Sequence, residues 1–246
     1  MKSSSLSMIN SPFWLIERSF FSMSKNVCFM FAKTCWNCEL IMLHFKRINM
    51  RSVGMLRLGI DIDGTVTAQD TFVPYLNESF QCDITLDDMT EYDLTKLLKI
   101  SNEEFWGWMN EYEPLIYKQA KPAEGAKEIL NQMKHHHQLI YITARRQHHS
   151  DITYKWFEEN HVHYDDIELV GGHHKVEAVQ KHKIDVFFED HHGNATMIAK
   201  EADIPVILFN SPYNQMPIDE RIIRVNNWQE ASQWIKQYEK RLQTAY

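Results

Sequence analysis

Hydrophobic positions in residues 55–246 fall into short apolar runs that alternate with amphipathic segments. Runs rich in β-branched and aromatic residues are typical of buried strands, and they occupy 56–63, 137–144, 166–171, 185–190 and 204–210. Segments with helical spacing occupy 122–136, 150–161, 174–182, 194–202 and 227–242. Strands that alternate with helices predict an α/β fold in which helices cover both faces of a parallel sheet.

The alternation stops between about 66 and 120. Residues 85–100 and 101–119 have helical patterns, and the second segment opens with a capping box from Ser101 to Glu104. No strand pattern of comparable strength occurs there. We therefore expect a helical module inserted directly after the first strand of one domain that spans 55–246.

Residues 1–54 differ in kind from the rest. They carry two acids against seven bases, and their Phe-, Met- and Ser-rich sequence keeps neither a helical nor a strand period. Cys35 and Cys38 have the CxxC spacing of redox and zinc sites, but a structural zinc needs four ligands. The favoured interpretation is an N-terminal extension that is disordered, or an over-extended reading frame with Met50 or Met55 as the true start.

Charge and cysteine usage limit the partners and the compartment. The net charge is −7, and removing the +5 of the first 54 residues leaves −12 for the remainder, which argues against a nucleic-acid polymer as partner. Charges interrupt every apolar run of the first 54 residues well before the roughly 20 residues that span a membrane. Three of the four cysteines precede residue 40, so no disulfide framework spans the body, and we expect a cytoplasmic protein.

The acid pair Asp61 and Asp63 ends the first predicted strand. Ligands of open parallel sheets bind beyond the carboxyl ends of the strands, and residues two apart on a strand face the same side. Carboxylates this close repel each other, and Mg²⁺, which prefers carboxylate and phosphate oxygens, relieves that repulsion. Gly64 then permits a sharp turn, and Thr65 offers a hydroxyl. The alternative is a strand that merely ends in an Asp-rich turn.

Two further strand ends carry matching chemistry. Thr143 ends the run 137–144, where its hydroxyl suits a phosphate oxygen. Glu189 and Asp190 end the run 185–190 as a second pair of acids. Together with the first acid pair, these ends predict one cation-dependent site at the edge of the sheet.

A lysine completes this set. Lys175 stands at a predicted helix start just after the strand ELVGG, where an ammonium group can neutralise both phosphate and acids. Lys181 and Lys183 are alternatives to it, and a solvated side chain is the alternative role. Only the position after the strand favours Lys175.

The ordered set DIDGT, YITAR, lysine and FFED resembles the motifs of the haloacid dehalogenase (HAD) superfamily of phosphohydrolases, over nearly all of residues 56–210. The resemblance implies a HAD-like Rossmannoid fold of three layers, with a central parallel sheet and a small helical cap after the first strand. It also implies a role for each motif residue: Asp61 as nucleophile, Asp63 as general acid and base, Thr143 and Lys175 as phosphate ligands, and Asp61, the backbone carbonyl of Asp63 and Asp190 as Mg²⁺ ligands, with Glu189 in support.

Within the superfamily the chain resembles the 5′(3′)-deoxyribonucleotidase group, including bacterial members assigned as nucleotidases by similarity. The stretches that carry this resemblance are PAEGAKEIL, FFEDHHGNA, LFNSPYNQ and VNNW. It implies a small phosphomonoester as partner, with a nucleoside monophosphate favoured, and a cap that selects the leaving group. Phe105, Trp106 and Trp108 are candidates to stack on a nucleobase, and the alternative is that they pack the core of the cap.

Other functions stay open at this point. A sugar phosphate or another small phosphomonoester fits the same chemistry, and a non-catalytic regulator that retains the fold is a third interpretation, against which the intact set of motif residues argues. The oligomeric state is open, with a homodimer among the forms allowed. The 13 histidines cluster in runs beside helices and turns, which indicates solvated side chains, with zinc ligation as the alternative.

Deletion of residues 1–49 is expected to leave fold and activity intact, because every predicted strand and every motif residue lies after residue 55. The measurement compares solubility, thermal unfolding and phosphatase turnover of the full and shortened chains. An insoluble or inactive shortened protein would show that the segment has a role.

Overall fold

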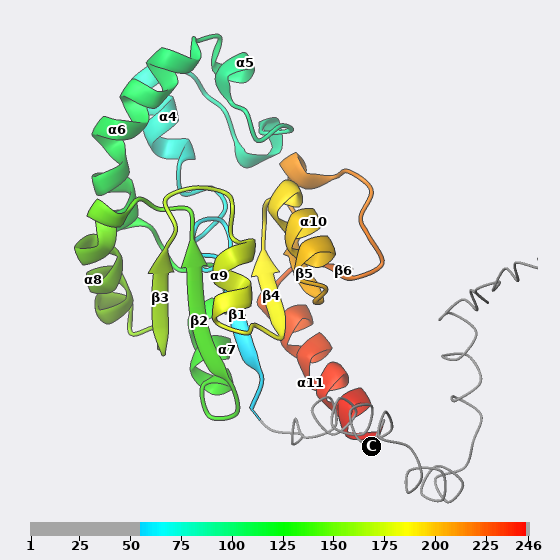
Figure 1. Ribbon diagram of the computed structural model, residues 1–246. Coiled ribbons are helices and arrows are strands. Elements are labelled where there is room, and N and C mark those ends of the chain that lie inside the picture. Colours follow the sequence, from blue (N-terminus) through cyan, green and yellow to red (C-terminus); the bar gives the residue numbers. More distant parts are fainter. Residues whose placement is uncertain (1–54, 245–246) are drawn as a thin grey trace, which may run out of the picture. The chain divides into compact units, whose positions relative to one another are not determined.

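The computed structural model describes residues 55–244, and its centre is a six-stranded sheet in the order β3-β2-β1-β4-β5-β6 (Figure 1). Every neighbouring pair of strands is parallel. The strands are β1 (Arg57–Ile60), β2 (Gln138–Thr143), β3 (Asp166–Leu169), β4 (Val186–Glu189), β5 (Val206–Phe209) and β6 (Ile222–Val225). The predicted parallel sheet is confirmed, and β6, which the sequence analysis missed, extends it at one edge.

Helices cover both faces of the sheet, which makes the three predicted layers (Figure 1). One face packs against α7 (Ala126–Met133), α8 (Ser150–Asn160) and α11 (Trp228–Thr244). The other packs against α9 (Val176–Lys181) and α10 (His192–Glu201). Since both faces are buried, β2, β4 and β5 are apolar over most of their length instead of alternating with polar residues. The edge strand β3 does alternate, with buried Ile167 and Leu169 each following a more exposed acid.

The period of two along each strand divides its side chains between these two cores. On β4, Val186 and Phe188 belong to the core with α7 and α11, whereas Phe187 belongs to the core with α9 and α10. Gly59 on β1 lies against the Phe187 ring, so close that an added Cβ would come within 2.4 Å of a ring carbon. A glycine at this point is what allows a large aromatic ring beside the central strand.

The cap lies above the carboxyl ends of the strands (Figure 1). It contains α4 (Val73–Phe80), the 3₁₀ turn η1 (Leu86–Asp88), α5 (Thr95–Leu98) and α6 (Asn102–Gln119). The predicted capping box is confirmed, because Glu104 N–H donates to Ser101 Oγ and the Glu104 carboxylate accepts from Ser101 N–H. The all-helical insertion after β1 is also confirmed.

The prediction of one helix over 85–100 is wrong. That segment holds only η1 and α5, with irregular chain between them. The capping box of Thr85 and Asp88 begins η1, and Asp93, which accepts from Thr95 N–H, stands just before α5, so local side-chain contacts start two short helices instead of one long one. The helix α4 was not predicted at all.

Two histidines correct the expectation that the histidine runs are solvated. His135, His136 and His148 are exposed, but His137 and His149 are buried. His137 directly precedes β2, and its Nε2 lies 3.7 Å from Glu239 Oε1 of α11, the closing helix. Period and propensity carry no signal for a buried histidine, because its burial depends on partners remote in sequence.

The expectations for residues 1–54, including the CxxC pair, fall outside the described residues. Across residues 55–244, no helix combines the length and apolar character that crossing a bilayer requires.

Two glycine substitutions should have opposite effects on stability. Gly59→Ala places a methyl group against Phe187 and should lower the free energy of unfolding by about 1–3 kcal/mol. Gly107→Ala lies on exposed helix α6 with nothing within 4 Å of the new Cβ, and should raise it by up to about 1 kcal/mol. Urea unfolding measures both, and equal effects would contradict the close packing at β1.

Candidate active site

Three carboxylates gather where β1 and β4 end. Asp61 follows β1, Glu189 is the last residue of β4, and Asp190 follows it. One oxygen of each lies within 4.8 Å of the others, and all three residues are buried. Asp61 N–H donates to the carbonyl of Phe188 at 2.9 Å, so the backbone pairing of two neighbouring strands sets the distance between these acids.

Lys175 supplies the positive charge inside the cluster. Its side chain is fully buried, and its Nζ lies 2.7 Å from Asp61 Oδ1 and 2.9 Å from Glu189 Oε2. Although burial opposes the charged ammonium, the adjacent Asp61 and Glu189 outweigh it and raise the pKa of Lys175. The two alternatives lie elsewhere, since Lys181 pairs with Glu168 on the surface and Lys183 is exposed.

One ammonium group does not balance three carboxylates. Burial, then the nearby Glu189, raises the pKa of Asp61 from 3.8 to about 7, against the lowering effect of Lys175. Burial followed by Glu189 and Asp61 holds the pKa of Asp190 well above its ordinary value. The protein alone therefore leaves this cluster short of positive charge.

A hard divalent cation fits the cluster. The three acids offer the oxygen ligands that such ions prefer. Among the described residues, the Lys175 ammonium group at 2.7 Å is the partner of Asp61 Oδ1, which leaves this oxygen a lone pair for a metal. These residues could hold the ion directly. Burial and repulsion among the carboxylates raise the pKa values of Asp61 and Asp190, and the charge of the ion would relieve that repulsion.

The loop after β1 is shaped to approach this cluster. Gly64 has φ of +77°, and a Cβ on it would lie 2.3 Å from Asp190 Oδ2. Only a glycine combines that left-handed conformation with that approach. The loop is closed by the backbone N–H groups of Val66 and Thr67, which both donate to the carbonyl of Ile62 at 2.9 Å.

Asp63 lies apart from the three-carboxylate cluster and is held by an arginine. Arg145 Nε donates to Asp63 Oδ2 at 2.8 Å, and Nη2 donates to Oδ1 at 2.7 Å. This two-pronged contact fixes the plane of the carboxylate. The Asp63 side chain is 24% exposed while that of Arg145 is fully buried, so the acid is open to a substrate on one side.

Thr143 ends β2 beside β1, and it is buried. Its Oγ1 accepts a hydrogen bond of 3.2 Å from the N–H of Arg145. The threonine therefore stands at the same edge of the sheet as the acids, with its hydroxyl hydrogen still able to donate.

Sequence reasoning assigned no role to Arg145, Tyr213 or Tyr92. Tyr213 donates its hydroxyl to Asp190 Oδ2 at 2.5 Å, and Asn214 donates its side-chain amide to the Asp190 carbonyl at 2.7 Å. Both lie in the stretch LFNSPYNQ, and Arg145 lies in YITAR, so the motifs contained them. Only contacts between remote segments show which acid each one holds.

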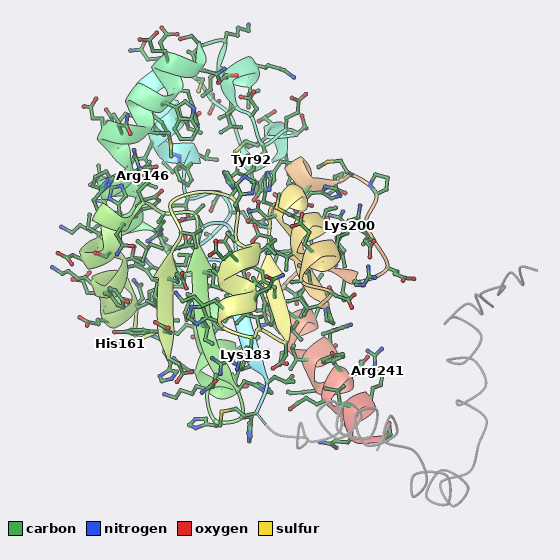
Figure 2. All side chains as sticks on the ribbon, in the orientation of Figure 1. Tyr92, Arg146, His161, Lys183, Lys200 and Arg241 are labelled. Carbon is green, nitrogen blue, oxygen red and sulfur yellow. The ribbon has the colours of Figure 1, made fainter. Side chains whose placement is uncertain are left out.

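Tyr92 comes from the cap and lies between the cap and the strand ends (Figure 2). Its ring packs edge-on against His191, with 4.2 Å between ring centroids, and lies 6.1 Å from the ring of Tyr213. Desolvation, followed by the charges of Asp190 and Asp61, raises the pKa of Tyr92, although the residue as a whole is 52% exposed. This aromatic residue of the cap faces the acids.

The three aromatic candidates lie in other surroundings. Trp108 is buried in the cap core, stacks on Tyr112 and donates its indole N–H to Ser79 at 2.8 Å. Phe105 packs against the same cluster, and Trp106 is 55% exposed at the surface. The contacts of Phe105 and Trp108 therefore agree with the alternative interpretation, in which these residues pack the core of the cap.

The sequence is similar to a family of nucleotidases, which agrees with the phosphatase-like arrangement of the acids and the lysine. The family described as "5' nucleotidase, deoxy (Pyrimidine), cytosolic type C protein" matches residues 54–242. "Putative nucleotidase YqfW" of Bacillus subtilis is 72% identical over 181 residues, which are 74% of this chain and 94% of that protein.

Solved structures resemble the fold at low sequence identity. A haloacid dehalogenase-like protein, ATU0790 of Agrobacterium tumefaciens, superposes with a TM-score of 0.54 at 13% identity, covering 75% of this chain and 99% of that one. YfnB of Bacillus subtilis, which was crystallised bound to magnesium, has a TM-score of 0.50 at 13% identity, covering 74% and 98%. The chain has the fold of haloacid dehalogenase-like proteins, belongs to the cytosolic type C 5′-nucleotidase family and is a hydrolase of phosphoric monoesters.

Proposed function

We propose that the protein is a Mg²⁺-dependent nucleotidase that dephosphorylates (deoxy)nucleoside monophosphates through an aspartyl-phosphate on Asp61. The observation that carries the proposal is the position of Asp61, which lies at the tip of the central strand, paired with Lys175 and within 4.8 Å of two further acids. The family and its curated relatives favour a nucleotide as substrate.

The first chemical step is attack by the Asp61 carboxylate on phosphorus, which breaks the bond to the ester oxygen. Lys175 and Thr143 hold the non-bridging phosphate oxygens, where charge is spread in the transition state. Lys175 thus has two tasks, because it also holds Asp61 in place through the 2.7 Å ion pair. Burial of this lysine strengthens both interactions, since little water screens them.

Asp63 handles the protons of both steps. As an acid it protonates the departing alkoxide, and as a base it then removes a proton from the water that attacks the aspartyl-phosphate. That attack releases inorganic phosphate and regenerates the carboxylate of Asp61. The partial exposure of Asp63 leaves it accessible to both the leaving group and water.

Asp61 and Asp190, with the backbone carbonyl of Asp63, would hold the Mg²⁺, and Glu189 would support it from the buried side. When bound, the ion supplies positive charge that keeps Asp61 ionised and offsets the charge of the phosphoryl group. The magnesium-bound structure of YfnB supports this choice of metal.

A panel of nucleoside monophosphates and sugar phosphates tests substrate and metal together. Wild-type protein should release phosphate only with Mg²⁺ and with the highest kcat/KM on a nucleoside monophosphate. Asp61→Asn should lower kcat by about a thousandfold or more, because the amide is a poor nucleophile, whereas Asp87→Asn, at an exposed carboxylate of the cap, should not.

Three results of that panel would contradict parts of the proposal. Turnover that survives chelation would exclude the metal role, and full turnover by Asp61→Asn would exclude this nucleophile. A sugar phosphate as the best substrate would exclude only the nucleotide assignment.

Stability should link the cation to pH. Since the metal-free pKa of Asp61 is raised from 3.8 to about 7, the stability contributed by its protonated form is full below about pH 4 and is lost as pH rises through about 7. Mg²⁺ binds the ionised form, so the increase in melting temperature that Mg²⁺ causes should grow between about pH 5 and about pH 8. Thermal unfolding with and without Mg²⁺ measures it.

Asp61→Asn is the control for this effect, because it removes one of the two carboxyl groups whose pKa is raised and should reduce the pH dependence of the Mg²⁺ increment. The metal site would be contradicted if Mg²⁺ did not raise the melting temperature of the wild type, or raised it equally at about pH 5 and about pH 8.

A further inference from the structure

The helix α6 of the cap is joined to the loop after β2 by buried polar contacts. Glu113, on α6, is only 5% exposed, and its Oε2 accepts from Arg146 and lies 3.0 Å from His149 Nε2. Arg146 also donates to Asn110 of the same helix at 2.6 Å. Figure 2 shows Arg146 where the cap meets the sheet domain. A buried carboxylate needs such partners, so this contact fixes the cap to the loop.

One turn further along α6, Tyr117 reaches the neighbouring arginine of that loop. The guanidinium carbon of Arg145 lies 4.0 Å from the centroid of the Tyr117 ring, and the ring packs edge-on against His149 at 5.3 Å. Tyr117 is 5% exposed, so this cation–π contact is shielded from water, which strengthens it.

Arg145 is therefore held from three sides. Tyr117 of the cap covers its face, Thr153 of α8 accepts from Nη1 at 3.2 Å, and Asp63 accepts the two bonds from Nε and Nη2. A guanidinium group is planar and rigid, so its orientation dictates the orientation of the carboxylate that it grips. Movement of Tyr117 would change where Asp63 points.

We propose that Arg145 is a positioning residue for Asp63, and that the cap sets its position through Tyr117 and Glu113 of α6. The cap then takes part in the chemistry of proton transfer, in addition to covering the substrate. This inference rests on the proposed function only in that Asp63 transfers the protons. The competing explanation is an ordinary ion pair that stabilises the fold without orienting the acid.

The leaving group separates these explanations. The alkoxide of an alkyl phosphate needs a proton as it departs, whereas p-nitrophenolate is stable enough to leave without one. Misplacement of Asp63 should therefore lower kcat/KM for an alkyl phosphate much more than for p-nitrophenyl phosphate. A loss of fold stability alone would lower both equally.

The experiment compares p-nitrophenyl phosphate with the alkyl phosphate that wild-type protein hydrolyses fastest, using kcat/KM with Mg²⁺ present. Tyr117→Leu removes the ring over Arg145, and Arg145→Lys keeps the charge but removes the fork. Each should lower kcat/KM for the alkyl phosphate roughly tenfold or more, with less than about a threefold loss on p-nitrophenyl phosphate.

Matched variants control for the packing. Tyr117→Phe keeps the ring and should recover most of the rate that Tyr117→Leu loses. Glu113→Gln should show a weaker form of the same substrate dependence, whereas Glu111→Gln, at an exposed position of the same helix, should show none. Thermal unfolding of each variant checks the fold, and Glu113→Gln together with Tyr117→Phe carries the test if Tyr117→Leu does not fold.

Asp63→Asn provides the benchmark that keeps two failures apart. If it loses the alkyl phosphate selectively while the Tyr117, Arg145 and Glu113 variants lose both substrates equally or neither, the positioning role is overturned and the role of Asp63 stands. If Asp63→Asn itself affects both substrates equally, the assignment of Asp63 as proton donor fails, and the positioning inference fails with it.

Discussion

Lys175 lies buried between Asp61 and Glu189 and forms an ion pair with each of them. This network leaves the cluster of three carboxylates with excess negative charge, and the rest of the site depends on that imbalance. Two of the three carboxylates share the ammonium group, while Asp190 is held by neutral donors, the Tyr213 hydroxyl above all. Burial without full compensation holds the carboxyl pKa values high. Such a cluster is costly for the fold unless a cation completes it.

The sheet order explains how residues far apart in sequence reach one place. β1 lies in the middle, with β2 on one side and β4 on the other, and all three are parallel. Their carboxyl ends therefore bring Asp61, Thr143 and Glu189 to the same edge, and Lys175 enters from the connection after β3. The irregular turn with Gly64 is the local feature that lets the first of these ends curl toward Asp190.

Sequence reasoning reached the features that are local or periodic. The buried strands could be read from short apolar runs, and the residues at their ends followed from the rule that parallel strands present their carboxyl ends together. The contact between Asp63 and Arg145 joins residues 82 apart, and Glu113 meets His149 across 36. The helical and strand periods of hydrophobic positions do not encode such pairs, because each member looks like an ordinary polar residue within its own segment. The same limit applies to Trp108, whose place in the cap core depends on helix α4, which the sequence did not reveal.

The contacts divide the site into two groups of charged residues, which are held by different parts of the fold. The group that contains Asp61, Glu189, Asp190 and Lys175 is fixed by β1, β4 and the chain after β3, so the sheet domain supplies all of its charged groups, with Tyr92 of the cap beside them. The group that contains Asp63 and Arg145 is shared, because Tyr117 of the cap covers the guanidinium group. A displacement of α6 would therefore act first on Asp63 and leave the pairing of Asp61 with Lys175 intact. Under the proposed mechanism, the cap that covers the leaving group would also control, through α6, the transfer of a proton to it, while the carboxylate cluster would keep one geometry for every substrate.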